Sequence, residues 1–64
     1  MFVTQKEAAA IYAKAAWKWY GPRARSVARS IIRSLGKKGD TAGVRAWHRV
    51  LQEIEQIEKD AASD

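Results

Sequence analysis

Three arginines spaced four residues apart are the side chains of this 64-residue sequence best suited to binding chemistry. On a helix, Arg25, Arg29 and Arg33 would form one ridge, because residues four apart lie on the same face. A serine follows each of them as a small hydrogen-bonding group, and guanidinium groups bind phosphate oxygens strongly. With their basic neighbours, the predicted phosphate contacts are Arg23, Arg25, Arg29, Arg33, Lys37 and Lys38.

The same ridge has a second interpretation, in which the arginines are only a solvated helix face. Residues 21–38 carry six basic and no acidic side chains, residues 39–64 carry three basic and six acidic ones, and the net charge is +5. An acidic helix of the same chain, or of a second copy, would partly neutralise the arginines. Solvated charged faces are common, so this interpretation is favoured over phosphate binding.

The lone histidine and the absence of cysteine exclude most catalytic chemistry. A zinc site needs several ligands at defined spacing, and His48 has no such set around it. General acid–base catalysis needs a pocket and a partner carboxylate, which Glu53 and Glu55 are poorly placed to supply. Without cysteine there is no disulfide framework, redox motif or thiolate nucleophile. We therefore expect a protein that is not an enzyme and that binds no metal, cofactor or small-molecule substrate.

Aromatic side chains gather at residues 17–20, just before a Gly-Pro pair. Trp17 and Trp19 are two residues apart, about 200° around a helix, so both cannot face one core. The apolar positions of this segment recur at helical spacing, at Ala8, Ile11, Ala15 and Trp19. This spacing predicts Trp19 in the core and Trp17 as the more exposed of the two. Trp17 would then either cap the edge of a small core, which is the favoured interpretation, or anchor an interface. Tryptophan is enriched at interface hot spots, so the candidate protein-interface residues are Trp17 and Tyr20.

The first two helices that carry these residues have clear end signals. Thr4 and Glu7 form a capping box before an Ala-rich stretch that lacks glycine and proline. Gly21-Pro22 ends this helix and starts the next one, since glycine suits a helix end and proline a first turn. The second helix has a regular apolar stripe and is expected to end at Gly36, before a flexible Lys-Lys-Gly stretch.

A third helix begins at Asp40 or Thr41, either of which can cap it. Its apolar stripe includes Trp47, which is expected in the core. We predict an all-α fold for residues 1–64: a small three-helix bundle with helices at about 5–20, 22–36 and 41–60 and a frayed polar tail at about 61–64. Both linkers are short, so consecutive helices should pack as neighbours.

The size of the chain limits its core and its location. A chain this short buries only about 60% of the surface that its unfolded form exposes, so it needs well-packed helices, a partner or a second copy. No apolar run approaches the roughly 20 residues of a membrane span, and a membrane partner is not expected. The N-terminal residues also lack the basic segment of a secretory signal. We therefore expect a cytoplasmic protein.

The segment from Gly39 to Val50, after a Tyr-Gly turn and an amphipathic helix, resembles a family of short alphaproteobacterial proteins of unknown function. Those proteins are similar in showing a helix, a glycine turn and a helix, followed by Gly-Asp-x-x-Gly-(Val/Ile)-x-x-Trp. The matching residues are Gly39, Asp40, Gly43, Val44 and Trp47. The resemblance covers about residues 8–58. It implies a helical fold and a bacterial cytoplasmic origin, and it implies no activity.

Two hypotheses of function follow. The first is a small non-enzymatic interaction protein, an accessory or regulatory subunit that docks a helical face on a larger protein or on itself. An antiparallel homodimer would set the basic second helix against the acidic third one. The alternative is a nucleic-acid-binding protein that lays the second helix along phosphates, with a helix-turn-helix-like third helix toward the bases. The candidate base contacts are then Arg45, His48 and Arg49.

Overall fold

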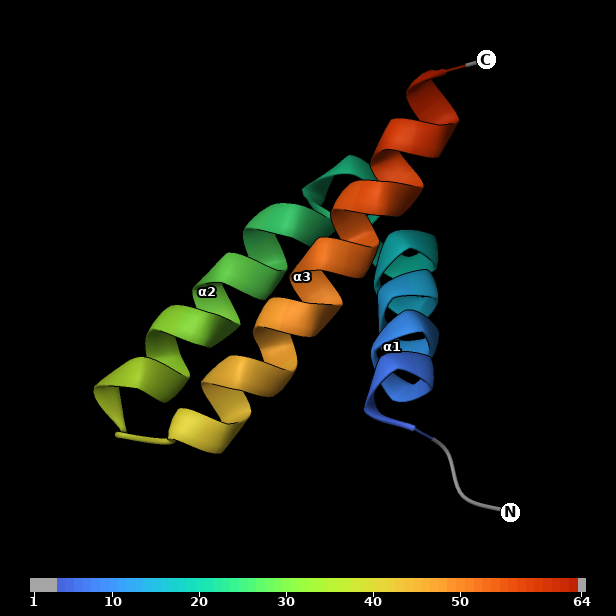
Figure 1. Cartoon of the computed structure of the whole chain (residues 1–64). Coiled ribbons are helices and arrows are strands. Elements are labelled where there is room, and N and C mark those ends of the chain that lie inside the picture. Colours follow the sequence, from blue (N-terminus) through green and yellow to red (C-terminus); the bar gives the residue numbers. More distant parts are fainter. Residues whose placement is uncertain (1–3, 64) are drawn as a thin grey trace.

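The computed structural model describes residues 4–63 and confirms the predicted all-α class (Figure 1). Helix α1 spans Gln5–Tyr20, a short 3-10 turn η1 spans Gly21–Arg23, α2 spans Ala24–Lys37 and α3 spans Thr41–Ala62. The bounds of α1 and the start of α3 are those predicted. Helix α3 extends through Ala62, into the tail predicted at about 61–64, and Asp64 lies outside the described residues.

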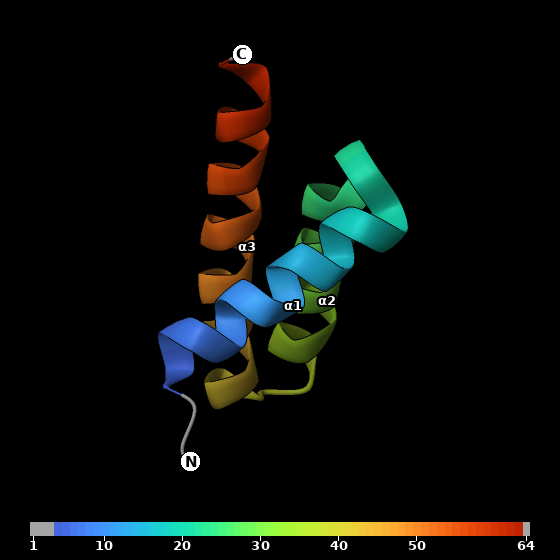
Figure 2. The same ribbon diagram turned by 90° about the vertical axis from the view of Figure 1, so that its right-hand side faces the viewer.

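The three α-helices form a hairpin with a crossing helix, which replaces the predicted three-helix bundle. Helices α2 and α3 lie side by side and run antiparallel, and α1 crosses them obliquely (Figures 1 and 2). Both α1 and α2 pack along α3, whereas they touch each other little. The physical reason lies in the linker: Gly21 has a φ of +57°, and the 3-10 turn that follows sends α2 away at an angle to α1.

The core is small and rich in alanine. Its buried residues are Ala9, Ala13, Ala24, Ala28, Val50, Leu51 and Ile54. Ile54 of α3 is the one large side chain among them that is fully buried. Because alanine side chains are short, the helices that carry them can pack closely. Trp47 packs against this core as predicted, although it is only partly buried.

The packing face of α1 differs from the predicted one. Ala9 and Ala13 are buried and Trp17 packs against the core, whereas Trp19 is 79% exposed and Ile11 is 60% exposed. The two tryptophans have therefore exchanged the positions that the sequence predicts. The reason is that α1 has apolar residues on two faces, and the face with small side chains allows the close crossing over the α2–α3 hairpin.

The turn between α2 and α3, which the sequence predicts as a flexible stretch, is closed by two backbone hydrogen bonds. Gly39 has a φ of +75°, and its N–H donates to the carbonyl of Gly36 at 3.1 Å. The next N–H, from Asp40, donates to the carbonyl of Leu35 at 3.0 Å. These two bonds form a Schellman motif, which favours glycine at the left-handed position. Gly36 therefore lies inside α2, and the helix ends one residue later, at Lys37.

Side-chain caps fix the starts of α1 and α3. Thr4 Oγ1 accepts a hydrogen bond from the Glu7 N–H at 3.1 Å and donates one to Glu7 Oε1 at 3.1 Å, which confirms the predicted N-terminal cap. Asp40 Oδ1 accepts from the Gly43 N–H at 2.9 Å, so Asp40 is the cap of α3. An aspartate or threonine at this position satisfies a backbone donor that would otherwise lack a helical partner.

Candidate interaction surfaces

The predicted phosphate contacts are all exposed to solvent; they are Arg23, Arg25, Arg29, Arg33, Lys37 and Lys38. The one ion pair among residues 4–63 joins Arg25 Nη1 of α2 to Glu58 Oε1 of α3 at 3.3 Å. Both side chains are partly exposed, so the pair stabilises the hairpin by about 0–1 kcal/mol. The acidic half of α3 thus meets the start of the basic ridge within the same chain, and this contact does not need a second copy.

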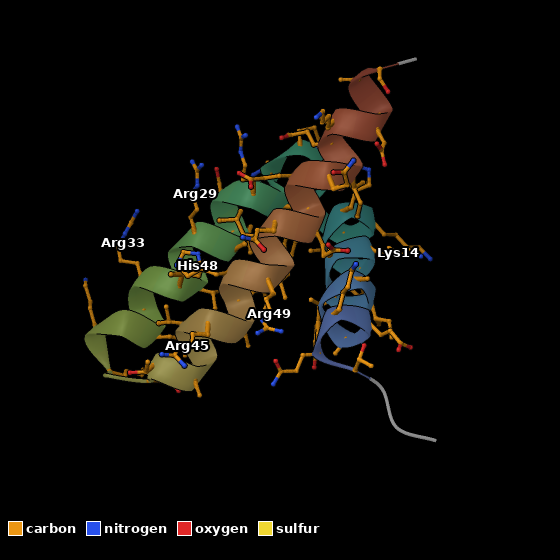
Figure 3. The ribbon with its side chains drawn as sticks, in the orientation of Figure 1. Lys14, Arg29, Arg33, Arg45, His48 and Arg49 are labelled. Atoms are coloured by element: carbon orange, nitrogen blue, oxygen red, sulfur yellow. The ribbon has the colours of Figure 1, made fainter. Side chains whose placement is uncertain are left out.

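The rest of the ridge joins the candidate base contacts on the surface of the hairpin. Arg29 and Arg33 project outward from α2, and Arg45, His48 and Arg49 lie along the first half of α3 (Figure 3). We call these five residues the basic surface. All five are exposed, and neither α2 nor residues 41–52 of α3 contains an acidic side chain.

The geometry of the hairpin differs from that of a helix-turn-helix motif. In that motif the two helices cross at about 90–120°, so that the second helix can enter the major groove while the first lies over it. Here α2 and α3 run side by side and antiparallel (Figure 1). A phosphate-binding role for the basic surface would therefore use both helices together and would not insert α3 alone.

A second surface is the outer face of α1, which we define by Ile11, Tyr12, Ala15 and Trp19. Ile11 and Tyr12 are each 60% exposed, and Ala15 and Trp19 are exposed beside them. On its α3 side this face continues into an open groove that Tyr12 lines. Tyr12 also packs at a tilt against Trp47, with ring centroids 6.1 Å apart. The groove is further lined by Ala8, Ala46, Arg49 and Val50.

The two predicted interface residues lie apart from the outer face of α1. Trp17 is partly buried against the core, as expected of a residue at the core's edge, but the prediction that it is more exposed than Trp19 is wrong. Tyr20 is half exposed, at the last position of α1 and about 100° around the helix from Trp19. The outer face itself was missed because its spacing is that of a core stripe. The repeated alanines on the opposite side of α1 are the signal that could have revealed it.

The described residues contain neither a metal-binding cluster nor a membrane-spanning helix. Across residues 4–63, no three His, Cys, Asp or Glu side chains gather closely enough to hold a metal ion. None of the helices in this range has both the length and the apolarity needed to cross a bilayer. His48 is exposed on α3 between arginines, which would repel a cation.

No protein-family model, curated protein or solved structure matches the chain. The two surfaces, one apolar on α1 and one basic on the α2–α3 hairpin, are therefore the features from which a function can be inferred.

Proposed function

We propose that this chain is a small non-enzymatic interaction protein, an accessory or regulatory subunit that docks through the outer face of α1. The observation that carries the proposal is the exposure of Trp19, at 79%, in line with Ile11 and Tyr12. Contiguous apolar patches on soluble proteins mark interaction sites, because covering them removes apolar area from water at about 25 cal/mol per Å². Tryptophan and tyrosine are also the residues that most often dominate the binding energy of an interface.

The small core gives a second reason for a docking role. Four of the seven buried residues are alanines, which remove little apolar area from water on folding. Domains of this size are marginally stable without disulfides, metals or a partner. A partner that binds only the folded chain adds its binding free energy to the stability of the fold.

The experiment that tests the docking role compares the tagged wild-type chain with Trp19→Ala and with Arg29→Ala in affinity capture from the host. Both substitutions lie on exposed positions, so circular dichroism should show the same helicity in all three chains. We expect a stoichiometric protein partner with wild type and Arg29→Ala, resistant to nuclease and lost with Trp19→Ala. The same partner captured equally well by Trp19→Ala would contradict docking through this face.

A second candidate function, binding to nucleic-acid phosphates, is supported by the basic surface. The hairpin gathers Arg29 and Arg33 with the cations of α3, and arginine binds phosphate bidentately. The basic surface has no exposed large apolar side chain, which a membrane-binding helix would need. Phosphate binding would use the hairpin, with Arg45 and Arg49 contributing from the groove beside the outer face of α1.

This second function is tested by the salt dependence of binding to duplex DNA. Replacing Arg29, Arg33 and Arg45 with glutamine removes three charges from the basic surface. The control replaces Lys6, Lys14 and Lys59 with glutamine and removes the same charge elsewhere. The slope of log K against log salt should fall by about 3 in the first variant and stay unchanged in the control. Equal changes in the two variants would show that only the net charge matters.

A further inference from the structure

Together with Ala8 of the adjoining groove, residues of the outer face of α1 alternate small and large side chains in a seven-residue pattern. Ala8, Tyr12, Ala15 and Trp19 follow one another at intervals of four, three and four residues. This is the spacing of the contact face of a two-helix coiled coil. Helix α1 lies in front of the other two helices in Figure 2, and Tyr12, Ala15 and Trp19 are exposed on it.

We infer that the occupant of this face is α1 of a second copy of the chain, packed antiparallel about a two-fold axis. The inference rests on the proposed docking role of the outer face of α1. An axis passing between residues 13 and 14 sets Trp19 opposite Ala8 of the second copy and Tyr12 opposite Ala15. Each large side chain then meets a small one, and symmetry repeats both contacts. The face is therefore complementary to itself in this direction.

A parallel pairing of the same helices lacks this complementarity. It would place Trp19 against Trp19 and Ala8 against Ala8, which crowds one end of the helix pair and leaves a void at the other. The sequence of the face thus favours the antiparallel direction by packing.

Charges at the edge of the face also support an antiparallel pair. Glu7 and Lys18 are exposed at opposite ends of α1 and lie on the same flank as Ile11, within about 40° of it around the helix. In the antiparallel register, Lys18 of one copy lies about two residues, or about 3 Å along the axis, from Glu7 of the other. Opposite charges therefore meet at both ends of the pair, which favours this register.

Sedimentation equilibrium of the purified full chain, up to about 1 mM so that weak association is seen, tests for the second copy. We expect a monomer–dimer equilibrium that Trp19→Ala weakens about 1,000-fold, because a hot-spot tryptophan is worth roughly 30-fold and occurs twice in the dimer. Tyr20→Ala is the matched control, since it removes an exposed aromatic on another side of α1 and should leave the equilibrium unchanged. A wild-type chain that stays monomeric overturns the inference.

The failure of this inference can be told apart from the failure of the docking role. The chain could prove monomeric while Trp19→Ala still abolishes capture of a different protein. That result would support the docking role and overturn only the inference of a second copy. A monomeric chain whose capture is insensitive to Trp19→Ala overturns both. The monomer could instead bind vesicles of anionic phospholipid, with binding abolished by Trp19→Ala. That result would show that the outer face of α1 binds a membrane surface, and it would also overturn the inference of a second copy.

Single cysteines test the register, because the chain has none of its own. In the antiparallel pair, position 8 of one copy lies about 1.5 Å along the axis from position 18 of the other, whereas each position is about 14–16 Å from its own symmetry mate. Mixed Ala8→Cys and Lys18→Cys chains should therefore form a mixed disulfide under mild oxidation, and neither chain alone should form one. Disulfides within either single variant, or none in the mixture, would overturn the antiparallel register.

Discussion

Gly43 lies where the α2–α3 turn closes onto α3, and replacing it with alanine tests the packing of that turn. A Cβ built on Gly43 would lie 2.6 Å from Asp40 Oδ2 and 3.1 Å from Leu35 Cδ1. The first distance is shorter than real Cβ contacts allow, so the Asp40 carboxylate must move. Its movement breaks the 2.9 Å hydrogen bond that it accepts from the Gly43 N–H.

Two opposing effects set the size of the change in the free energy of unfolding. Alanine favours a helix over glycine by about 1 kcal/mol. Loss of an aspartate cap costs about 1 kcal/mol, and the crowding of Leu35 adds to that cost. We therefore expect Gly43→Ala to destabilise the chain by up to about 1 kcal/mol instead of stabilising it. In the Asp40→Ala variant the carboxylate that caps α3 and crowds position 43 is absent. In that background Gly43→Ala should stabilise the chain by up to about 1 kcal/mol.

The assay is urea unfolding, followed by circular dichroism, of the wild type, the two single variants and the double variant. The four free energies of unfolding form a double-mutant cycle, for which we expect a coupling of about 1 kcal/mol or more. The double variant should be at least as stable as Asp40→Ala alone. A Gly43→Ala chain about 1 kcal/mol more stable than wild type, with additive effects in the cycle, would refute the close approach.

Three further predictions concern buried faces and the ion pair. Ile54→Ala should cost about 2–5 kcal/mol in urea unfolding because Ile54 is fully buried, whereas the exposed Ile11→Ala should change stability by less than about 0.5 kcal/mol; equal losses would mean that the faces are misassigned. Ala13→Leu should overpack the core by about 1–3 kcal/mol, whereas Ala15→Leu should be nearly neutral in thermal melts. A harmless Ala13→Leu would argue against the alanine face. Arg25→Gln should cost at most about 1 kcal/mol, and less at high salt. A larger, salt-independent loss would show a stronger role for this arginine.

The ends of the helices were predictable because capping depends on neighbouring residues. Thr4 and Glu7 are three residues apart, and their hydroxyl, carboxylate and backbone groups meet within one helical turn. Asp40 caps α3 for the same reason. The error at Gly36 has a local cause too: two glycines stand three residues apart, and only Gly39 takes the left-handed conformation that ends the helix.

The packing face of α1 could not be predicted from spacing alone. Its large apolar residues recur at the interval of a core stripe, and its alanines recur at the same interval on the other side of the helix. The choice between the faces depends on what α1 meets in space, which is mainly α3 with the buried Val50, Leu51 and Ile54. Periodicity contains no information about those contacts. The helix crossing was missed for the same reason.

The basic residues of the candidate surfaces were easier to predict. Arginines and lysines are exposed in most proteins, so all nine predicted basic positions lie in water as expected. What the sequence could not provide is their grouping. The antiparallel hairpin brings Arg29 and Arg33 onto the same part of the molecule as Arg45 and Arg49, which are more than ten residues away in sequence.

The most direct test of the central claim, that the outer face of α1 is the docking surface, is an NMR titration of the three tryptophan indole N–H groups. A concentration series of the chain alone, or a titration with a captured partner, would be followed in the same spectrum. We expect the Trp19 signal to shift most on association and that of Trp17 to stay in place, because Trp19 is exposed on the outer face whereas Trp17 packs against the core. The signal of Trp47, which packs against Tyr12 of that face, should shift less than that of Trp19. A shift of Trp17 with an unchanged Trp19 would contradict the claim.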